Sequence, residues 1–346
     1  MLTILSAGVS HGAMRSSIGT HTAASAARAI GHRKRAGGLQ KATLALVAVL
    51  CLCASGCMGT LPKHAGALST ATAPVVDGAA AAYQAANTIH EKRTDYDAIA
   101  EFDKTDPVYN PRIFHPLLTQ QSIDIRLAVL KAFQCYVQTL VEISSGTESP
   151  ALDDASKSVG ASLAGLGNTI LPAGSGSSAT STQPSLPISQ GTQNILSTGA
   201  NALGQFLVYR AIRRDLPQKV KDMDPQVQAL CKLLADEVDL LHDAETKDFD
   251  SILDRETLFL RDPDSKLSPE ERREAIMRLP ELAREQQEAD SQLALLKTAI
   301  MKLALTHHAL AADAQGNNPE SLKSKLGDLE AVGKNLGKFQ SSLPTN

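Results

Sequence analysis

Tryptophan is absent from the 346 residues, and the other aromatic residues are few, with 7 Phe and 5 Tyr. Large apolar side chains that could anchor two facing sheets are therefore scarce. Ala, Leu and Val must fill the core, and such side chains suit closely packed helices better than a β-sandwich. The sequence therefore predicts an all-α fold, and the length fits one or two domains.

Recognisable catalytic and cofactor motifs are also missing. The spacing of Gly160 and Gly165 matches the start of a P-loop, but Leu166 follows where the phosphate-binding Lys would stand. HExxH and GxSxG do not occur. His307 and His308 are the only adjacent histidines, and side chains of adjacent helical residues point about 100° apart, so they cannot chelate one ion together. We therefore expect a protein without catalytic, cofactor-binding or metal-binding residues, and not an enzyme.

Acidic residues are absent from residues 1–56, which carry six basic residues: Arg15, Arg28, Arg33, Lys34, Arg35 and Lys41. Subtracting these six from the 34 basic residues of the chain leaves 28 against 37 acidic residues, a net charge of −9. A clearly acidic body excludes nucleic acid as a partner, because phosphate binding needs clustered cations. It also excludes broad electrostatic adhesion to anionic lipid.

The basic stretch from Arg33 to Lys41 precedes an uncharged, largely apolar run over residues 42–56. This order is typical of an export signal. The run is shorter than the roughly 20 residues of a spanning helix, so a permanent transmembrane helix is the weaker alternative. We interpret residues 1–56 as a disordered leader and signal peptide, in which residues 1–38 precede a second candidate start at Leu39.

The run ends in Ala54-Ser55-Gly56-Cys57. This segment resembles the lipobox of bacterial lipoproteins, although the family usually has Leu where Ala54 stands. The resemblance implies acylation of the Cys57 thiol, cleavage before it, and membrane lipid as a partner. Several acyl chains would hold the protein firmly. Met58 replaces the Asp that commonly retains such proteins in the inner membrane, which implies the outer membrane, facing the periplasm, in a Gram-negative host. The alternative is an ordinary signal peptide followed by a chance Cys.

Only Cys135 and Cys231 remain after the leader and Cys57. An oxidising compartment permits a disulfide between them. The alternative is two separate buried thiols that act as small apolar side chains. The spacing of the two residues does not decide between these interpretations.

The mature body is expected to contain a flexible tether over residues 57–72 and a helical bundle over residues 73–346. The bundle is predicted to be mostly antiparallel, with six or seven helices, of which one or two are very long. The expected helices start near Pro74, span 119–145, 151–168, 190–213 and 216–262, and start again at Ser268 and at Asn318. Pro225 is a candidate break in the 216–262 helix.

Residues 158–209 contain no Asp, Glu, Lys, Arg or His. A Gly, Ser and Pro-rich loop at about 172–188 separates their two helical pieces, and small residues recur along both. We favour a hairpin packed within the bundle, where small residues allow close backbones. The alternative function is a membrane-active protein that inserts this hairpin into lipid.

Two acidic patches and the two adjacent histidines were considered as sites. One patch contains Asp95, Asp97, Asp103 and Asp106 with Tyr96 and Tyr109, and the other contains Asp236, Glu237, Asp239, Asp243 and Glu245. We interpret both as solvated faces, and His307 as a core histidine with a hydrogen-bonded ring. The predicted function is a lipid-anchored envelope protein with a structural or protein-interaction role and an envelope protein as its partner.

Overall fold

The computed structural model describes residues 60–102, 115–147, 190–208, 215–263, 266–316 and 319–342, with residues 154 and 158 singly. These residues form six helices and no strand: α2 (Leu61–Phe102), α3 (Gln120–Ser145), α5 (Gln190–Val208), α6 (Leu216–Arg261), α7 (Pro269–Ala314) and α8 (Pro319–Ser342). The all-α prediction is therefore confirmed. The leader, Cys57, the 172–188 loop and most of the 151–168 helix lie outside the described residues.

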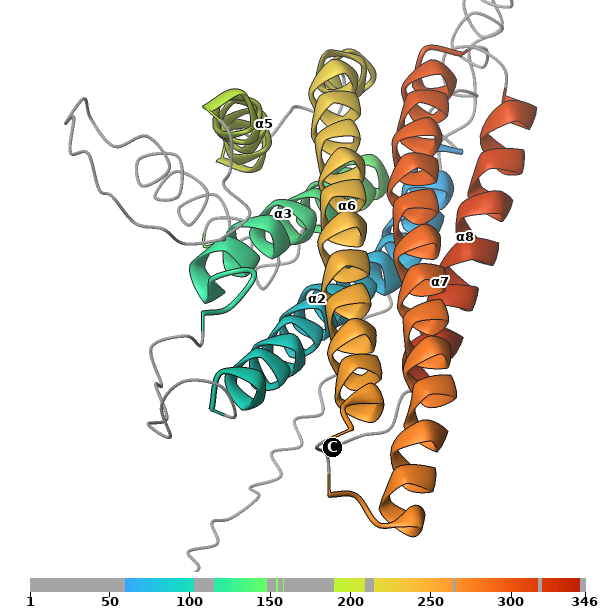
Figure 1. The fold of residues 1–346 in the computed structure, drawn as a ribbon. Coiled ribbons are helices and arrows are strands. Elements are labelled where there is room, and N and C mark those ends of the chain that lie inside the picture. The colour runs from blue at the N-terminus through green and yellow to red at the C-terminus, as the bar shows by residue number, and fades with distance from the viewer. Residues whose placement is uncertain are drawn as a thin grey trace, which may run out of the picture. The chain divides into compact units, whose positions relative to one another are not determined.

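The helices pack as a bundle around the long α6–α7 pair (Figure 1). Two contacts show that these helices are antiparallel. Gln228 of α6 bonds to the Ala304 carbonyl of α7, whereas Asp239, further along α6, bonds to Lys297, which comes earlier on α7. Helix α2 runs antiparallel to α7 and parallel to α6. Helix α8 packs against α7 and α2. Helix α3 packs mainly against α2 and also against α5, and α5 packs against α6 and α3.

Capping residues fix the helix boundaries that the sequence predicted. Ser268 and Glu271 form a reciprocal capping box, which satisfies free N–H groups at the start of α7. Thr119 caps α3 through its side chain, and Gly146 ends that helix with a positive φ of 74°. The predicted starts of α7 and α8 and the predicted end of α3 are confirmed.

The tether predicted over residues 57–72 is wrong from Leu61 onward, because α2 begins there. Leu61, Ala65 and Leu68 follow helical spacing, and all three are buried. Pro62 does not prevent this start, since the first turn of a helix needs no backbone N–H from it. Burial of the apolar stripe outweighs the low helix propensity of Gly66.

Prolines inside the long helices do not end them. Helix α6 continues through Pro225, so the break considered there is wrong. The residues on both sides, Val220, Met223 and Val227, are buried against the bundle. Tertiary packing on both flanks therefore holds the helix together despite the lost backbone hydrogen bond.

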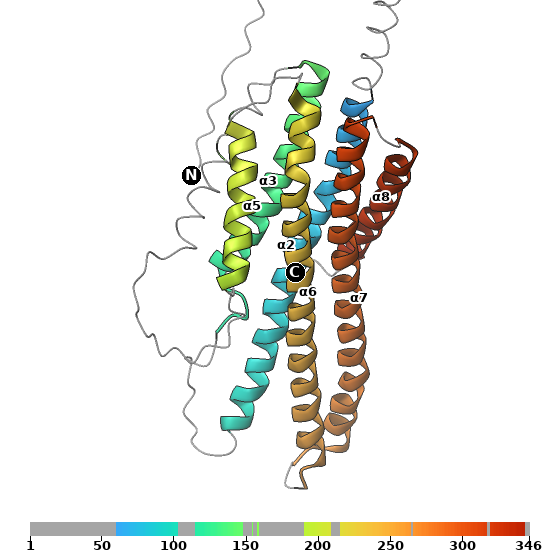
Figure 2. The same cartoon turned by 90° about the horizontal axis from the view of Figure 1, so that it is seen from above.

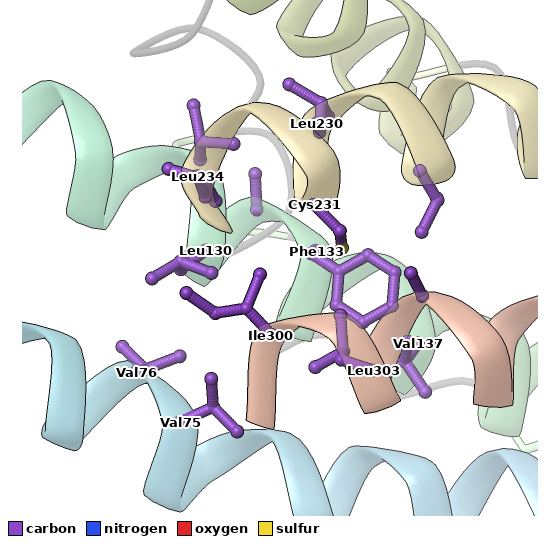
Figure 3. Close-up of a cluster of buried hydrophobic side chains, with 14 of the residues drawn as sticks. Val75, Val76, Leu130, Phe133, Val137, Leu230, Cys231, Leu234, Ile300 and Leu303 are labelled. Carbon is purple, nitrogen blue, oxygen red and sulfur yellow. The ribbon is translucent and has the colours of Figure 1, made fainter. Parts of the chain in front are cut away.

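The core is rich in Ala, Leu and Val, which come from all six described helices, as the scarcity of aromatic residues predicted. Figure 3 shows where four of these helices meet, with side chains from α2, α3, α6 and α7. Its labelled members are Val75, Val76, Leu130, Phe133, Val137, Leu230, Cys231, Leu234, Ile300 and Leu303. Such small and branched side chains allow the helices to approach closely.

Helix α5 is the described part of the uncharged 158–209 segment. Its apolar side chains Leu196, Leu203 and Phe206 are buried, and the helix packs against α3 and α6. Gly199 lies under Leu230 so closely that an added Cβ would be 2.5 Å from the Leu230 Cγ. Residues 190–208 are therefore packed within the bundle, as the favoured interpretation expected.

Candidate functional site

Figure 2 shows that α2 and α6 end, and α7 begins, at the same end of the bundle. Residues of these three helix ends line a cleft. We call it the end cleft, and its volume is about 720 Å³. The capping box at Ser268 fixes the start of α7 here, and the Phe259 carbonyl bonds to the Asp262 N–H where α6 ends. Three helix ends thus bring together residues that are far apart in the sequence.

The lining of the end cleft combines apolar and charged side chains. The apolar residues are Ile99, Ala100, Leu258, Phe259, Leu267 and Ala275. The polar and charged residues are Tyr96, Arg255, Glu256, Asp262, Glu271, Glu274 and Arg278. Pockets that combine apolar walls with a few convergent polar groups are the usual form of a binding site.

Large apolar side chains are unusually exposed in and around the end cleft. Ile99 is 61% exposed, Leu258 62% and Phe259 43%. Ile276 and Met277, on the first turns of α7, are also exposed. Exposed apolar side chains that gather in one place mark interaction surfaces more often than scattered ones do.

Glu256 is the buried charged group of the end cleft. Only 5% of this residue is exposed, and its carboxylate is hydrogen-bonded by the Tyr96 phenol. Burial, followed by the charge of Glu256, raises the pKa of Tyr96, so the phenol stays protonated and remains a donor. The pair places a fixed negative charge beside the apolar walls.

A chain of ion pairs connects α2 to α6 beside the end cleft. Asp248 accepts from the His90 ring at 2.8 Å and lies 3.0 Å from the Arg93 Nε. Arg93 also donates to Asp97 at 2.7 Å, and Asp97 meets Arg255 at 3.1 Å. We call these five residues the Asp248 cluster. It fixes α2 against the last turns of α6 and so positions two walls of the cleft.

Glu245 lies one turn before Asp248 on α6 and is 2% exposed. Its Oε2 has no hydrogen-bond partner. Burial, followed by the charges of Asp290 and Asp248, raises its pKa to about 8. A carboxyl in this position is protonated at neutral pH, which removes the cost of an unpaired buried charge.

A second polar network lies near the opposite ends of α6 and α7. Asp224 of α6 is 3.0 Å from His307 Nδ1 and 2.6 Å from His308 Nδ1, one histidine on each carboxylate oxygen. The other ring nitrogen of His307 is 3.1 Å from the Tyr136 hydroxyl. Gln228 donates to Asp224 and to the Ala304 carbonyl. We call these five side chains the Asp224 network.

The protons of the Asp224 network can be assigned from burial and hydrogen bonding. Burial lowers the pKa of His307, so its ring is neutral. Although burial opposes it, hydrogen bonds from His307 and His308 hold the pKa of Asp224 at about 2. The Asp224 anion therefore accepts from His307 Nδ1–H, and His307 Nε2 accepts from Tyr136. His307 is a fully buried, hydrogen-bonded core histidine, as predicted.

Aromatic rings enclose the Asp224 network. The Tyr136 ring lies 4.7 Å from the Phe206 ring in an edge-on arrangement, and Phe133 is 5.9 Å from His307. Neither Tyr136 nor His307 has exposed surface. Tyr136 and His307 are therefore core residues, and through the Asp224 network they connect α3, α6 and α7.

The solvated-face interpretation fails for two of the predicted acidic residues. Glu237 is largely buried and forms an ion pair with Arg126 of α3 at 2.9 Å, and Glu245 is buried as described above. Asp236, Asp239 and Asp243 are exposed as expected. The error arose because α6 has neighbours on several sides, so a polar position next to the apolar seam can also face another helix.

The other acidic patch divides between described and undescribed residues. Asp95 is exposed, Asp97 joins the Asp248 cluster, and Tyr96 lines the end cleft. Asp103, Asp106 and Tyr109 lie outside the described residues.

Cys135 and Cys231 are both free thiols, so the disulfide considered between them is not formed. Cys231 faces the buried cluster that contains Phe133 (Figure 3). Two positions further along α3, Cys135 points to a different side of that helix and is only half-buried. Burial raises the pKa of Cys231 to about 12, which keeps it protonated and unreactive.

The sequence analysis missed the end cleft because its walls come from three separate helix ends. One signal was available. Leu258, Phe259 and Leu260 are consecutive, and successive side chains on a helix point about 100° apart. All three cannot face one core, so at least one had to be exposed, and in the structure Leu258 and Phe259 are exposed while Leu260 is buried.

The described residues contain no group of three His, Cys, Asp or Glu side chains arranged to hold a metal ion. None of the described helices combines the length and the apolar character needed to cross a bilayer. Comparisons of this chain with protein families, with curated proteins and with solved structures find no match.

Proposed function

We propose that this chain is a lipid-anchored envelope protein that docks another protein through the end cleft. The observation that carries the docking role is the gathering of exposed apolar side chains, Ile99, Leu258 and Phe259, around a cleft with a buried carboxylate. Interfaces combine an apolar centre with a polar rim, and the end cleft has both. The proposed role is structural or interactive, not catalytic.

The anchor rests on the order of features at the start of the chain. A basic stretch, an uncharged run and Ala54-Ser55-Gly56-Cys57 follow one another as in bacterial lipoproteins. In a Gram-negative host, Met58 after the proposed acylation site Cys57 favours the outer membrane, facing the periplasm.

The alternative, insertion of the uncharged 158–209 segment into lipid, is less well supported. Its described part, α5, has Leu196, Leu203 and Phe206 buried against the bundle. Insertion would have to expose these side chains by separating α5 from α3 and α6, and the lost burial would oppose that step.

Palmitate labelling tests the anchor. Cells grown with a clickable palmitate analogue should yield a labelled protein that fractionates with membranes, and Cys57→Ser should lose both the label and the fractionation. A labelled Cys57→Ser protein, or an unlabelled wild type, would disprove the anchor.

Site-specific photocrosslinking in cells tests the docking role. A photoreactive amino acid at Leu258, in the end cleft, should give a discrete protein adduct. The matched control is Leu240, which lies on the same helix, is 53% exposed and is outside the cleft. Equal adducts from both positions, or none from Leu258, would contradict docking at this site.

A further inference from the structure

The charges of the end cleft favour a cationic partner. Four carboxylates line it, from Glu256, Asp262, Glu271 and Glu274, against the two guanidinium groups of Arg255 and Arg278. One group of each sign is already engaged: the Arg255 guanidinium lies 3.1 Å from Asp97, and the Glu271 carboxylate accepts from the Ser268 N–H in the capping box. Negative charge is therefore in excess at the lining.

The helix ends add to this preference. Helices α2 and α6 both end at the cleft, and a helix C-terminus carries a partial negative charge of about one half. Only α7 begins here, where the Ser268 hydroxyl accepts from the Glu271 N–H and Glu270 and Glu271 are acidic. At the end of α6, Arg261 lies in the last turn and Arg272 donates to the Leu260 carbonyl. The last turn of α2 has no basic residue, so the partial negative charge at its end adds to the preference for a cation.

Glu256 gives this preference a defined point of contact. Its carboxylate is nine-tenths buried, and its hydrogen bond comes from the Tyr96 phenol. No Lys, Arg or His among the described residues forms an ion pair with it. A buried carboxylate held by one neutral donor keeps unused acceptor capacity, which an entering ammonium or guanidinium group would satisfy.

The walls beside Glu256 require apolar contacts as well. Ile99, Leu258 and Phe259 remain largely exposed to water in the free protein. Covering them stabilises a complex by roughly 25 cal/mol for each Å² of apolar surface removed from water. A hydrophilic cation alone would satisfy Glu256 but would leave these side chains exposed.

We propose that the end cleft receives a Lys or Arg side chain presented by an apolar segment of a partner protein. The cationic nitrogen reaches Glu256, and apolar neighbours in the same segment cover Ile99, Leu258 and Phe259. This inference rests on the docking function proposed above and specifies the chemistry of the partner at that site.

Peptide binding to the full-length chain tests the inference. The lipidated protein is held in zwitterionic nanodiscs, with empty discs as the control for lipid binding. Three fluorescent peptides of equal length and pattern are compared by fluorescence anisotropy. The first is built from Leu and Lys, the second from Leu and Glu, and the third from Ser and Lys. The Leu/Lys peptide should bind at least about tenfold more tightly than the other two, a difference of roughly 1.4 kcal/mol.

Variants locate the binding. Glu256→Gln keeps the size of the side chain and an acceptor for Tyr96 but removes the charge, and it should weaken Leu/Lys binding about tenfold. Leu258→Ser should weaken it severalfold without affecting folding, because Leu258 is already exposed. Leu240→Ser and Asp236→Asn are the matched controls on exposed positions of the same helix and should leave binding unchanged.

The outcomes separate this inference from the docking function. Equal binding of the Leu/Glu peptide, no binding of Leu/Lys, or equal weakening by Leu240→Ser would overturn the cationic preference. Each variant is checked for its circular dichroism and melting temperature, so that misfolding is not counted as weaker binding. Photocrosslinks from Leu258 in cells would still support docking if the cationic preference failed, whereas their absence would remove the docking function itself.

Discussion

Near the start of α6, the Asp224 network gives both oxygens of its carboxylate a histidine partner and encloses His307 in aromatic rings. Towards the end of the same helix, two polar atoms are buried without a hydrogen bond: Glu245 Oε2 and Gln292 Nε2. Both regions lie largely between α6 and α7. The first is organised for stability, whereas the second contains buried groups without a hydrogen-bond partner.

This difference indicates where the molecule can gain from a partner. Fully satisfied buried networks make a core rigid, while incompletely satisfied ones cost stability. Such costs are concentrated at functional sites in many proteins. The unpaired groups around Glu245 therefore cost stability, whereas the end cleft, further along α6, is where we propose that a partner binds.

The largest effect is expected from Tyr136→Ala in the Asp224 network. The substitution removes a ring with no exposed surface and leaves His307 Nε2 without its donor. We expect the free energy of unfolding to fall by about 5 kcal/mol, measured by urea denaturation.

Tyr136→Phe is the control for this substitution. It removes only the hydroxyl and should cost about 1–2 kcal/mol. If Tyr136→Ala cost no more than Tyr136→Phe, the first region would not be the stabilising core described above.

The next largest effect concerns pH and Glu245, in the second region. Its pKa is about 8 in the folded chain against an ordinary value of 4.5, so the folded state holds the proton more tightly. The stabilisation that protonated Glu245 gives to the folded state is fully present below about pH 4.5, and it is lost as the pH rises through 8. The free energy of unfolding should decrease across this window by on the order of 4 kcal/mol.

Glu245→Gln should remove that decrease and make the protein more stable than wild type at pH 9. Asp250→Asn, at an exposed position of the same helix, is the control and should leave the slope unchanged. Urea denaturation at pH 5, 7 and 9 measures the effect. An unchanged slope in Glu245→Gln would mean that the carboxyl titrates as an exposed group does.

A pair of glycine substitutions tests how tightly the first region is packed. In Gly199→Ala, the new Cβ would meet three side-chain atoms of Leu230 at 2.5–2.7 Å. We expect a net loss of about 2 kcal/mol in the free energy of unfolding. In Gly66→Ala no atom lies within 4 Å, so improved helix propensity should add about 0.7 kcal/mol. The same sign for both substitutions would disprove close packing of α5 on α6.

The smallest effect is expected from Lys92→Ala in the second region. Its ammonium group lies 2.7 Å from Glu285, but both side chains are about a third or more exposed. Exposed ion pairs contribute little, so the loss should be about 0.5 kcal/mol and should shrink in high salt. A loss above about 2 kcal/mol would show that surface charge, and not buried packing, connects α2 to α7.

The sequence by itself determined the fold class and most helix boundaries, because these depend on local chemistry. Thr119, Gly146 and the Ser268–Glu271 box act through backbone groups within a few residues of themselves. The periodic Leu, Ala and Val residues likewise predicted which faces are buried. Where long-range packing competed with local signals, at Gly66 and Pro225, the local argument gave the wrong boundary.

Only the tertiary structure decided the sites. Tyr136, Asp224 and His307 are far apart in the chain, and so are the three helix ends that form the end cleft. Whether Glu237 or Glu245 faces water depends on which helix packs over it, and the separation of Cys135 from Cys231 depends on how α3 is rotated. Helix periodicity gives each residue a direction around its own axis, but the neighbour in that direction follows from packing with segments distant in the sequence.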